Sequence, residues 1–175
     1  VDEVKGFDNV YTLGLRGGWD VLCVTYFVVC GASRLARYNV TAAALADTRT
    51  GKVRWAYDTG GRINSSPSIW GNRICITTYA GSIFCLRQSD GTKLWSTYVK
   101  RDAFRYESFY ASASTDGERL YTIARSGKIV TLDAATGQVL WTDEVSSLGY
   151  STPAVGRDRI FVGDFNGGLR AYRKA

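Results

Sequence analysis

A segment that ends in tryptophan occurs three times in this chain, each time with a glycine four residues before the tryptophan. The copies are residues 45–55 (LADTRTGKVRW), 85–95 (CLRQSDGTKLW) and 131–141 (TLDAATGQVLW), and a fourth begins at Ala171. Equivalent positions recur at spacings of 40, 46 and 40 residues. A period of roughly 20 to 50 residues is typical of solenoids, propellers and repeat arrays, so the repeat restricts the fold to these classes.

Each repeat contains four short β-type runs separated by turn residues. In the third unit the runs cover residues 111–114, 119–124, 128–132 and 138–143, and the turns between them contain glycine. Such runs predict hairpins, and no window has a helical period. We therefore expect an all-β protein, a β-propeller built from four-stranded antiparallel blades. A sandwich or a solenoid does not explain a four-strand period with tryptophan on the last strand.

The tryptophans and glycines of the repeat are expected to hold neighbouring blades together rather than to bind a ligand. A tryptophan ring is large and mostly apolar, and glycine lets a turn approach its neighbour closely. We assign this structural role to Trp55, Trp95 and Trp141 and to Gly51, Gly91 and Gly137.

The run at 131–141 resembles the tryptophan-docking repeat of the pyrroloquinoline quinone (PQQ)-like β-propeller family. Residues 65–67 (SSP) and 151–153 (STP) match the inner strand of that family, in which small residues precede proline. A four-stranded blade of this kind is shared with WD40-like and YVTN-like repeats. The resemblance covers about residues 40–175 and implies the propeller fold.

The repeat divides the chain into two parts. Residues 1–39 form an atypical N-terminal segment with an expected strand at 21–29, and residues 40–175 carry the blades. About four blades are expected, the last without its outer strand, whereas propellers have roughly four to eight. A strand near 10–13 could close a small ring. We favour instead a larger ring of about seven or eight blades, because an open edge exposes unpaired backbone. The repeat units cover about 64–98, 110–143 and 150–175, with outer strands at 40–57.

The composition argues against several kinds of chemistry. The chain has no histidine, the commonest general base and metal ligand, so no catalytic or metal-binding residue is predicted. Its net charge of +6 is scattered rather than gathered in a basic stripe, so no nucleic-acid partner is expected. The longest apolar run, residues 21–29, is far shorter than the ~20 residues of a membrane-spanning helix, so no transmembrane segment is expected.

The four cysteines, Cys23, Cys30, Cys75 and Cys85, have no spacing typical of a zinc site. Cys75 and Cys85 flank a turn at 79–81. A three-residue loop places them opposite each other, where they can bond, and a two-residue loop points them to opposite faces. We expect buried thiols rather than disulfides.

One connection between blades is longer than its equivalents. Trp95 and Tyr110 are 15 residues apart, whereas the equivalent residues at 55 and 64 and at 141 and 150 are 9 apart, which indicates an insertion of six residues. The insertion is basic and aromatic, and propeller geometry places it on the face of the turn at 79–81. It is either a tolerated surface insertion or a binding loop for an acidic or extended segment of a partner. The binding-loop candidates are Lys100, Arg101, Phe104, Arg105, Tyr106 and Tyr110.

The resemblance implies two kinds of function. Some PQQ-like propellers are scaffolds in outer-membrane protein assembly or extracytoplasmic sensor domains, and others are dehydrogenases that hold PQQ and calcium. The latter characteristically cover the quinone with a disulfide between adjacent cysteines, and this chain has no such pair. We predict a non-catalytic protein-binding, scaffold or sensor module outside the cytoplasm, without a cofactor. Its partner would be a protein or peptide on the loop face, and further blades or self-association would complete the ring. The alternative is part of a PQQ- and calcium-dependent quinoprotein dehydrogenase.

Overall fold

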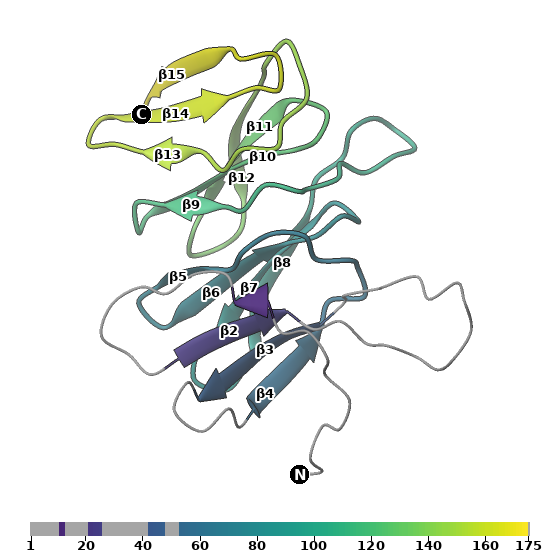
Figure 1. Ribbon diagram of the computed structural model, residues 1–175, viewed down its shortest axis with the longest axis vertical. Helices are drawn as coiled ribbons and strands as arrows, with labels where there is room; N and C mark the ends of the chain where they lie inside the picture. The colour runs from purple at the N-terminus through teal and green to yellow at the C-terminus, as the bar shows by residue number, and fades with distance from the viewer. Residues whose placement is uncertain (1–10, 13–20, 26–41, 48–52, 175) are drawn as a thin grey trace.

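The computed structural model describes residues 11–12, 21–25, 42–47 and 53–174 (Figure 1). Their strands form three four-stranded antiparallel sheets and one three-stranded sheet, which confirms the expected all-β architecture of four-stranded blades. The first sheet contains β1 (Tyr11–Thr12), β2 (Val21–Thr25), β3 (Ala42–Asp47) and β4 (Val53–Asp58). The second contains β5 (Ser68–Trp70), β6 (Arg73–Thr77), β7 (Ser82–Arg87) and β8 (Lys93–Tyr98). The third contains β9 (Ser114–Thr115), β10 (Arg119–Ile123), β11 (Lys128–Asp133) and β12 (Val139–Glu144), and the fourth β13 (Ala154–Val155), β14 (Arg159–Gly163) and β15 (Leu169–Arg173).

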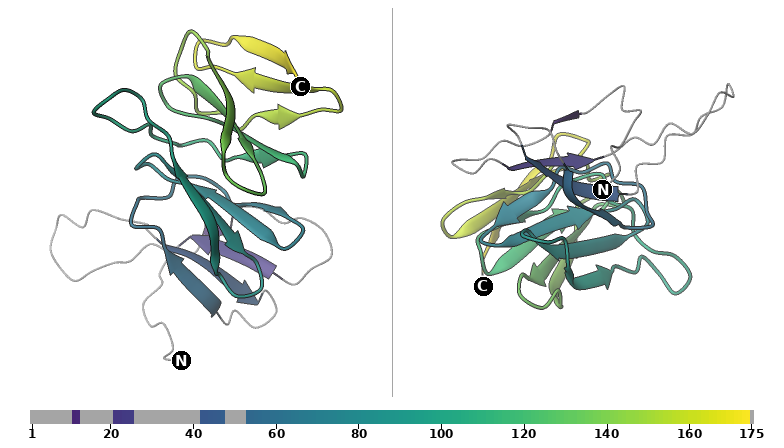
Figure 2. Two further views of the ribbon diagram at one scale, coloured as in Figure 1. Left: turned by 180° about the vertical axis from the view of Figure 1, so that it is seen from behind. Right: turned by 90° about the horizontal axis from the view of Figure 1, so that it is seen from below.

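The sheets follow one another in chain order along the long axis of the molecule. Within each sheet every strand pairs with its predecessor in the chain, so each blade is an up-and-down meander. Figures 1 and 2 show β2 to β4 at one end and β13 to β15 at the other. Because each four-stranded meander ends on the face where it began, the connections between blades lie on one face of the stack.

The first sheet contains strands from both sides of the division expected at residues 39 and 40. Tyr11 in β1 pairs with Thr25 in β2, and Val21 in β2 pairs with Asp47 in β3. The strand expected near 10–13 thus lies in the first blade, at the opposite end of the stack from β15. The strand expected at 21–29 is described over Val21–Thr25, and the rest of it lies outside the described residues.

The apolar core lies in layers between consecutive sheets. Successive side chains of β6 and β7 point to opposite faces of the sheet and so contribute to two of these layers. Ile74 and Phe84 pack toward the first sheet, while Cys75 and Ile83 pack toward the third. Nearly every residue of these two strands is buried, as expected for a blade covered on both faces. A third layer, between the third and fourth sheets, is formed by Ala111, Tyr121, Ile123, Ile129, Val145, Ile160 and Val162.

The hairpin between β6 and β7 has a three-residue loop. The Thr78 N–H donates to the Ser82 carbonyl at 2.9 Å, and Gly81 has a φ of +83°. This geometry places Cys75 directly opposite Cys85, and both are buried free thiols, as expected. The side chain of Cys23 and the whole of Cys30 lie outside what the structure describes, so the expectation for these two cysteines stays a prediction.

Burial determines how the Cys75–Cys85 pair should react. Desolvation raises the pKa of both thiols, and for Cys85 a hydrogen bond from Arg73 partly counteracts this effect. Because the thiolate is the nucleophile, we expect neither residue to react with iodoacetamide in the folded chain at neutral pH. Both should react after unfolding in urea, and peptide mass mapping separates them from the other two cysteines. Rapid alkylation of either residue in the native chain would contradict the described packing.

Candidate functional site

Two tryptophans contact the turn of the next blade in the same way. The ring of Trp55 lies against Gly91, where an added Cβ would be 2.6 Å from ring atom Cε3. Trp95 lies against Gly137 in the same manner, with a corresponding distance of 2.4 Å. Each ring nitrogen donates to the backbone carbonyl three residues before that glycine, at 2.9 and 3.2 Å. Both glycines have positive φ, so the conformation and the close approach both favour glycine.

The third tryptophan has a different environment. Trp141 is 40% exposed, compared with 8% for Trp95, and its ring contacts Tyr172 with centroids 5.2 Å apart. Gly51, the glycine of the first copy, lies outside the described residues. The structure thus brings together two of the three tryptophans with the glycines expected to accompany them.

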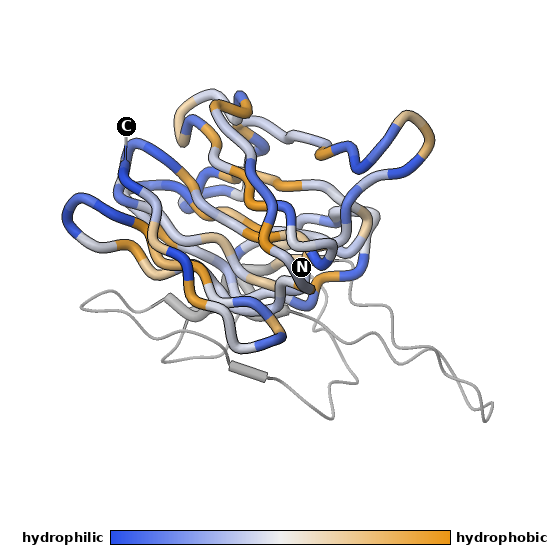
Figure 3. Tube along the Cα trace, turned by 90° about the horizontal axis from the view of Figure 1, so that it is seen from above, coloured by the Kyte–Doolittle hydropathy of each residue, from blue (hydrophilic) through white to orange (hydrophobic). Residues whose placement is uncertain are grey.

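The inserted connection forms a small projecting hairpin, which we call the finger (residues 99–107). Lys100 and Tyr106 form an antiparallel bridge at its base, and the Arg101 N–H donates to the Arg105 carbonyl at 2.9 Å. Phe104 lies at the tip with 95% of its surface exposed. Figure 3 shows an apolar tip between hydrophilic flanks, projecting away from the blades. The insertion is therefore an ordered protrusion.

Hydrogen bonds hold the base of the finger on the β6–β7 hairpin. The Val99 N–H donates to the Gly81 carbonyl at 2.9 Å, and the Glu107 N–H donates to the Val99 carbonyl at 2.8 Å. The Glu107 side chain is 2% exposed, and its Oε1 lies 3.5 Å from Nζ of Lys128. Lys128 belongs to the next blade and also donates to the Lys100 carbonyl at 3.0 Å. Two blades therefore fix the direction in which the finger projects.

Of the two arginines at the tip, one is compensated by a carboxylate and the other is not. Asp102 accepts hydrogen bonds from Nε of Arg105 at 2.7 Å and from the backbone N–H of Phe104 at 3.0 Å. The hydrogen bond from Arg105 is the main cause of the lowered pKa of Asp102. Arg101 is exposed and forms no ion pair with a described residue. The tip thus presents a bare aromatic ring beside uncompensated positive charge.

A row of aromatic side chains crosses three blades near the base of the finger. The Tyr79 and Tyr110 ring centroids are 5.4 Å apart, those of Tyr110 and Tyr150 are also 5.4 Å apart, and those of Tyr150 and Phe165 are 5.7 Å apart. The Arg62 guanidinium lies over the Tyr79 ring at 5.0 Å from its centroid. Nε of Arg125 donates to the Tyr150 hydroxyl at 3.2 Å. We call this set the aromatic arc: Arg62, Tyr79, Tyr110, Arg125, Tyr150 and Phe165.

The repeat itself positions the aromatic arc. Tyr79, Arg125 and Phe165 are the first residues of equivalent three-residue hairpin loops. Each of their backbone N–H groups donates to a carbonyl of the preceding connection, at 2.7, 2.7 and 2.9 Å. Tyr110 and Tyr150 occupy another shared position, on those connections. The recurrence of large side chains at two repeat positions is the sequence signal for the arc. Of the six arc residues, only Tyr110 was among the binding-loop candidates predicted from the sequence.

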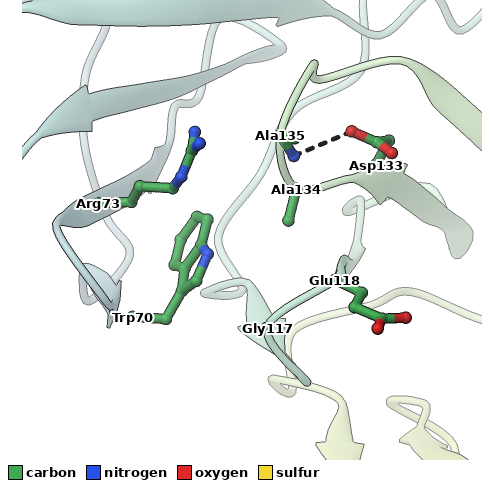
Figure 4. A pocket seen from close by; sticks show the side chains of 7 residues that line it. All are labelled: Trp70, Arg73, Gly117, Glu118, Asp133, Ala134 and Ala135. Carbon is green, nitrogen blue, oxygen red and sulfur yellow. Dashed lines mark hydrogen bonds between the residues drawn. The ribbon is translucent and has the colours of Figure 1, made fainter.

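A cavity of about 410 Å³ lies at the opposite end of the blades from the finger. Trp70 and Arg73 line one wall, and Figure 4 shows Glu118 on the other wall, directed away from Arg73. The Asp133 carboxylate is engaged in its own turn, where it accepts the N–H groups of the next turn residues at 2.9 and 2.7 Å. The cavity therefore does not gather several polar groups around one point, and the finger and aromatic arc form the better candidate site.

The described residues also limit what else the chain offers. Among them, no group of three or more cysteine, aspartate and glutamate side chains is placed to hold a metal ion. Over the same residues, no helical segment combines the length and apolar character needed to cross a bilayer.

These features define the class of protein as a stack of β-propeller blades with an ordered loop face. The family model described as "Outer membrane protein assembly factor BamB" matches residues 25–108 and 105–175, and the chain belongs to this family. The resemblance to PQQ-like propellers is thereby confirmed.

The chain spans less than half the length of the relative and of the two solved structures compared below. A protein named outer membrane protein assembly factor BamB from Kangiella koreensis is 27% identical over 93% of the chain, which spans 42% of that relative. The crystal structure of BamB from Moraxella catarrhalis has a TM-score of 0.68 and 21% identity, over 88% of this chain and 43% of that one. Quinohemoprotein alcohol dehydrogenase ADHIIG from Pseudomonas putida HK5 has a TM-score of 0.67 and 14% identity, over 88% and 29%. The two structural likenesses show the fold.

Proposed function

We propose that this chain is a non-catalytic protein-binding module that takes part in outer membrane protein assembly, outside the cytoplasm. Membership of the BamB family supports the proposal, as do the names of the relatives. The partner is a protein or a peptide that contacts the loop face, which comprises the finger and the hairpin turns beside it. No nucleic acid, metal or cofactor has a role in this proposal.

The observation that carries the proposal is the exposure of Phe104 on an anchored support. A large apolar ring that is 95% exposed buries almost no apolar surface, so it contributes almost nothing to the stability of this chain. The hairpin beneath it is held by backbone hydrogen bonds and by the ion pair between the buried Glu107 and the partly exposed Lys128. Exposed aromatic and arginine side chains on a rigid support are the composition of protein-binding hot spots.

We also propose that Trp55, Trp95 and Trp141, with Gly51, Gly91 and Gly137, are inter-blade docking residues. The contacts of Trp55 and Trp95 support this role directly. Trp141 and most of β15 are exposed, and we propose that further blades or a second copy of the chain cover these residues.

The alternative function is that of a partial quinoprotein dehydrogenase. The likeness to ADHIIG shows only a shared fold, and this chain has no pair of adjacent cysteines. Differential scanning fluorimetry with added PQQ and calcium separates the two functions, because a ligand that binds the native state raises the melting temperature. We expect no change; a saturable rise would favour the dehydrogenase.

The length of the repeat provides a test of the finger. Deletion of residues 101–106 gives this connection the length that the equivalent connections already have. We expect the shortened chain to keep its melting temperature but to lose co-purification with outer membrane assembly proteins from bacterial cells. Substitution of Arg157 by alanine, in a turn at the opposite end of the blades, is the matched control. Undiminished co-purification of the shortened chain would refute a role of the finger.

A further inference from the structure

We propose that the aromatic arc is a second binding site on the loop face, and that its ligand is an extended polypeptide segment in which carboxylate and apolar side chains alternate. The inference rests on the proposed function, because it specifies the chemistry of a protein partner. It is carried by residues other than those of the finger, so the two can fail separately.

The arc remains open to solvent although its rings touch one another. Tyr79 is 39% exposed, Tyr150 40% and Phe165 70%. Rings that served only to pack the blades would be buried, as Phe109 is a few residues away, with 0% exposed. The row crosses consecutive blades, so an extended segment lying along it would contact several blades at once.

The ring geometry favours side chains over flat ligands. Tyr79 and Tyr110 are inclined at 83°, Tyr110 and Tyr150 at 55°, and Tyr150 and Phe165 at 61°. Single-stranded nucleic acids bind on platforms where successive bases stack on aromatic faces. Rings inclined to one another do not form such a platform, whereas edge-to-face and tilted contacts are those that aromatic side chains of a peptide prefer, and the exposed rings also offer apolar surface to its aliphatic side chains.

The positive charge of the arc indicates which polar groups the ligand should carry. Arg62 and Arg125 are exposed, and no described acidic side chain forms an ion pair with either of them. The nearby Asp164 is engaged within its own turn, where it accepts the backbone N–H groups of Asn166 and Gly168 at 3.0 and 2.8 Å. Only Nε of Arg125 is used within the arc, so its terminal N–H groups are available. Guanidinium groups bind carboxylates in a bidentate manner, which favours an acidic segment.

Fluorescence anisotropy with the full chain tests this proposal. The probe is a short labelled peptide of alternating glutamate and leucine, compared with a peptide in which glutamine replaces glutamate. We expect the acidic peptide to bind more tightly and to weaken as salt is added, since exposed charges are screened. Equal binding of the two peptides, or no binding of either, would overturn the proposal.

Charge reversal locates the site. Each of Arg62→Glu and Arg125→Glu is expected to weaken binding of the acidic peptide about tenfold, equivalent to about 1.4 kcal/mol. Phe165→Ala should also weaken it, without lowering the melting temperature. Arg157→Glu, which makes the same charge change at the opposite end, should leave binding unchanged.

The variants also separate this inference from the proposed function. If the arc variants bind the peptide as tightly as the wild type does, the arc is not the site, even if deletion of the finger still abolishes co-purification. If the finger deletion has no effect while the arc variants lose the peptide, the proposed role of the finger fails and the arc stands.

Discussion

Alanine in place of Gly137 is expected to lower the free energy of unfolding by about 3 kcal/mol, because two costs add. Gly137 has a φ of +75°, a conformation that residues with a Cβ rarely adopt. The new methyl group would also lie 2.4 Å from Trp95 Cε3, so the docked ring must move. Urea unfolding followed by tryptophan fluorescence measures the change.

Gly117 provides the matched control for this substitution. Its φ is +98°, but an added Cβ would meet nothing within 4 Å. Gly117→Ala should therefore have only the backbone cost, about 1 kcal/mol. The difference between the two variants measures the contact between blades. Equal losses would show that Gly137 is needed for its turn alone and not for docking.

Trp95→Ala is expected to destabilise the chain by about 4 kcal/mol, because it removes a large buried ring and leaves a cavity between two blades. The ring is only 8% exposed and belongs to the largest core layer. The substitution also removes the hydrogen bond that the ring nitrogen of Trp95 donates to the Ala134 carbonyl. Chemical unfolding gives the value, and circular dichroism shows whether the variant folds.

Trp141→Ala is the control for this prediction. The residue occupies the equivalent repeat position but is 40% exposed, so its loss should cost less than half as much. If Trp95 and Trp141 proved equally important, the assignment of Trp95 to a buried interface would be wrong.

The blades could be predicted from the sequence because the residues that form each hairpin are close together in the chain. Glycine in the turns, and a glycine four residues before each repeated tryptophan, indicated four strands per unit, and the hairpins follow that pattern. The first blade was harder to predict, since β1 and β2 lack the glycine–tryptophan signature, and residues 26–41, which lie outside the described part of the chain, come between β2 and β3 in the sequence. The expected boundary between residues 39 and 40 was placed where the recognisable repeat begins, whereas the first sheet contains strands from both sides of that boundary.

Contacts between blades account for what the sequence did not predict. The insertion was evident from the repeat length, but its anchoring by Glu107 and Lys128 depends on two residues 21 positions apart in different blades. The arc depends on the same kind of contact, because Tyr110 meets Tyr79 and Tyr150 only after three blades are stacked. Residue type alone does not distinguish these tyrosines from others that pack in the core.

The finger and the aromatic arc together define one face on which a protein partner would be bound. Tyr106 in the finger and Tyr110 in the arc are four residues apart, and the hairpin at Gly81 supports both structures. A partner segment held in the arc would therefore lie beside the base of the finger. This arrangement would let one partner use both parts of the face.

Site-specific photo-crosslinking tests this central claim most directly. The crosslinking amino acid p-benzoylphenylalanine replaces Phe104 in one sample and Arg157, at the opposite end of the blades, in the other. In cells with an outer membrane, we expect position 104 to give crosslinks to outer membrane proteins or to their assembly machinery, identified by mass spectrometry, and position 157 to give none. Crosslinks of equal yield from both positions, or none to such proteins from position 104, would contradict binding through the loop face.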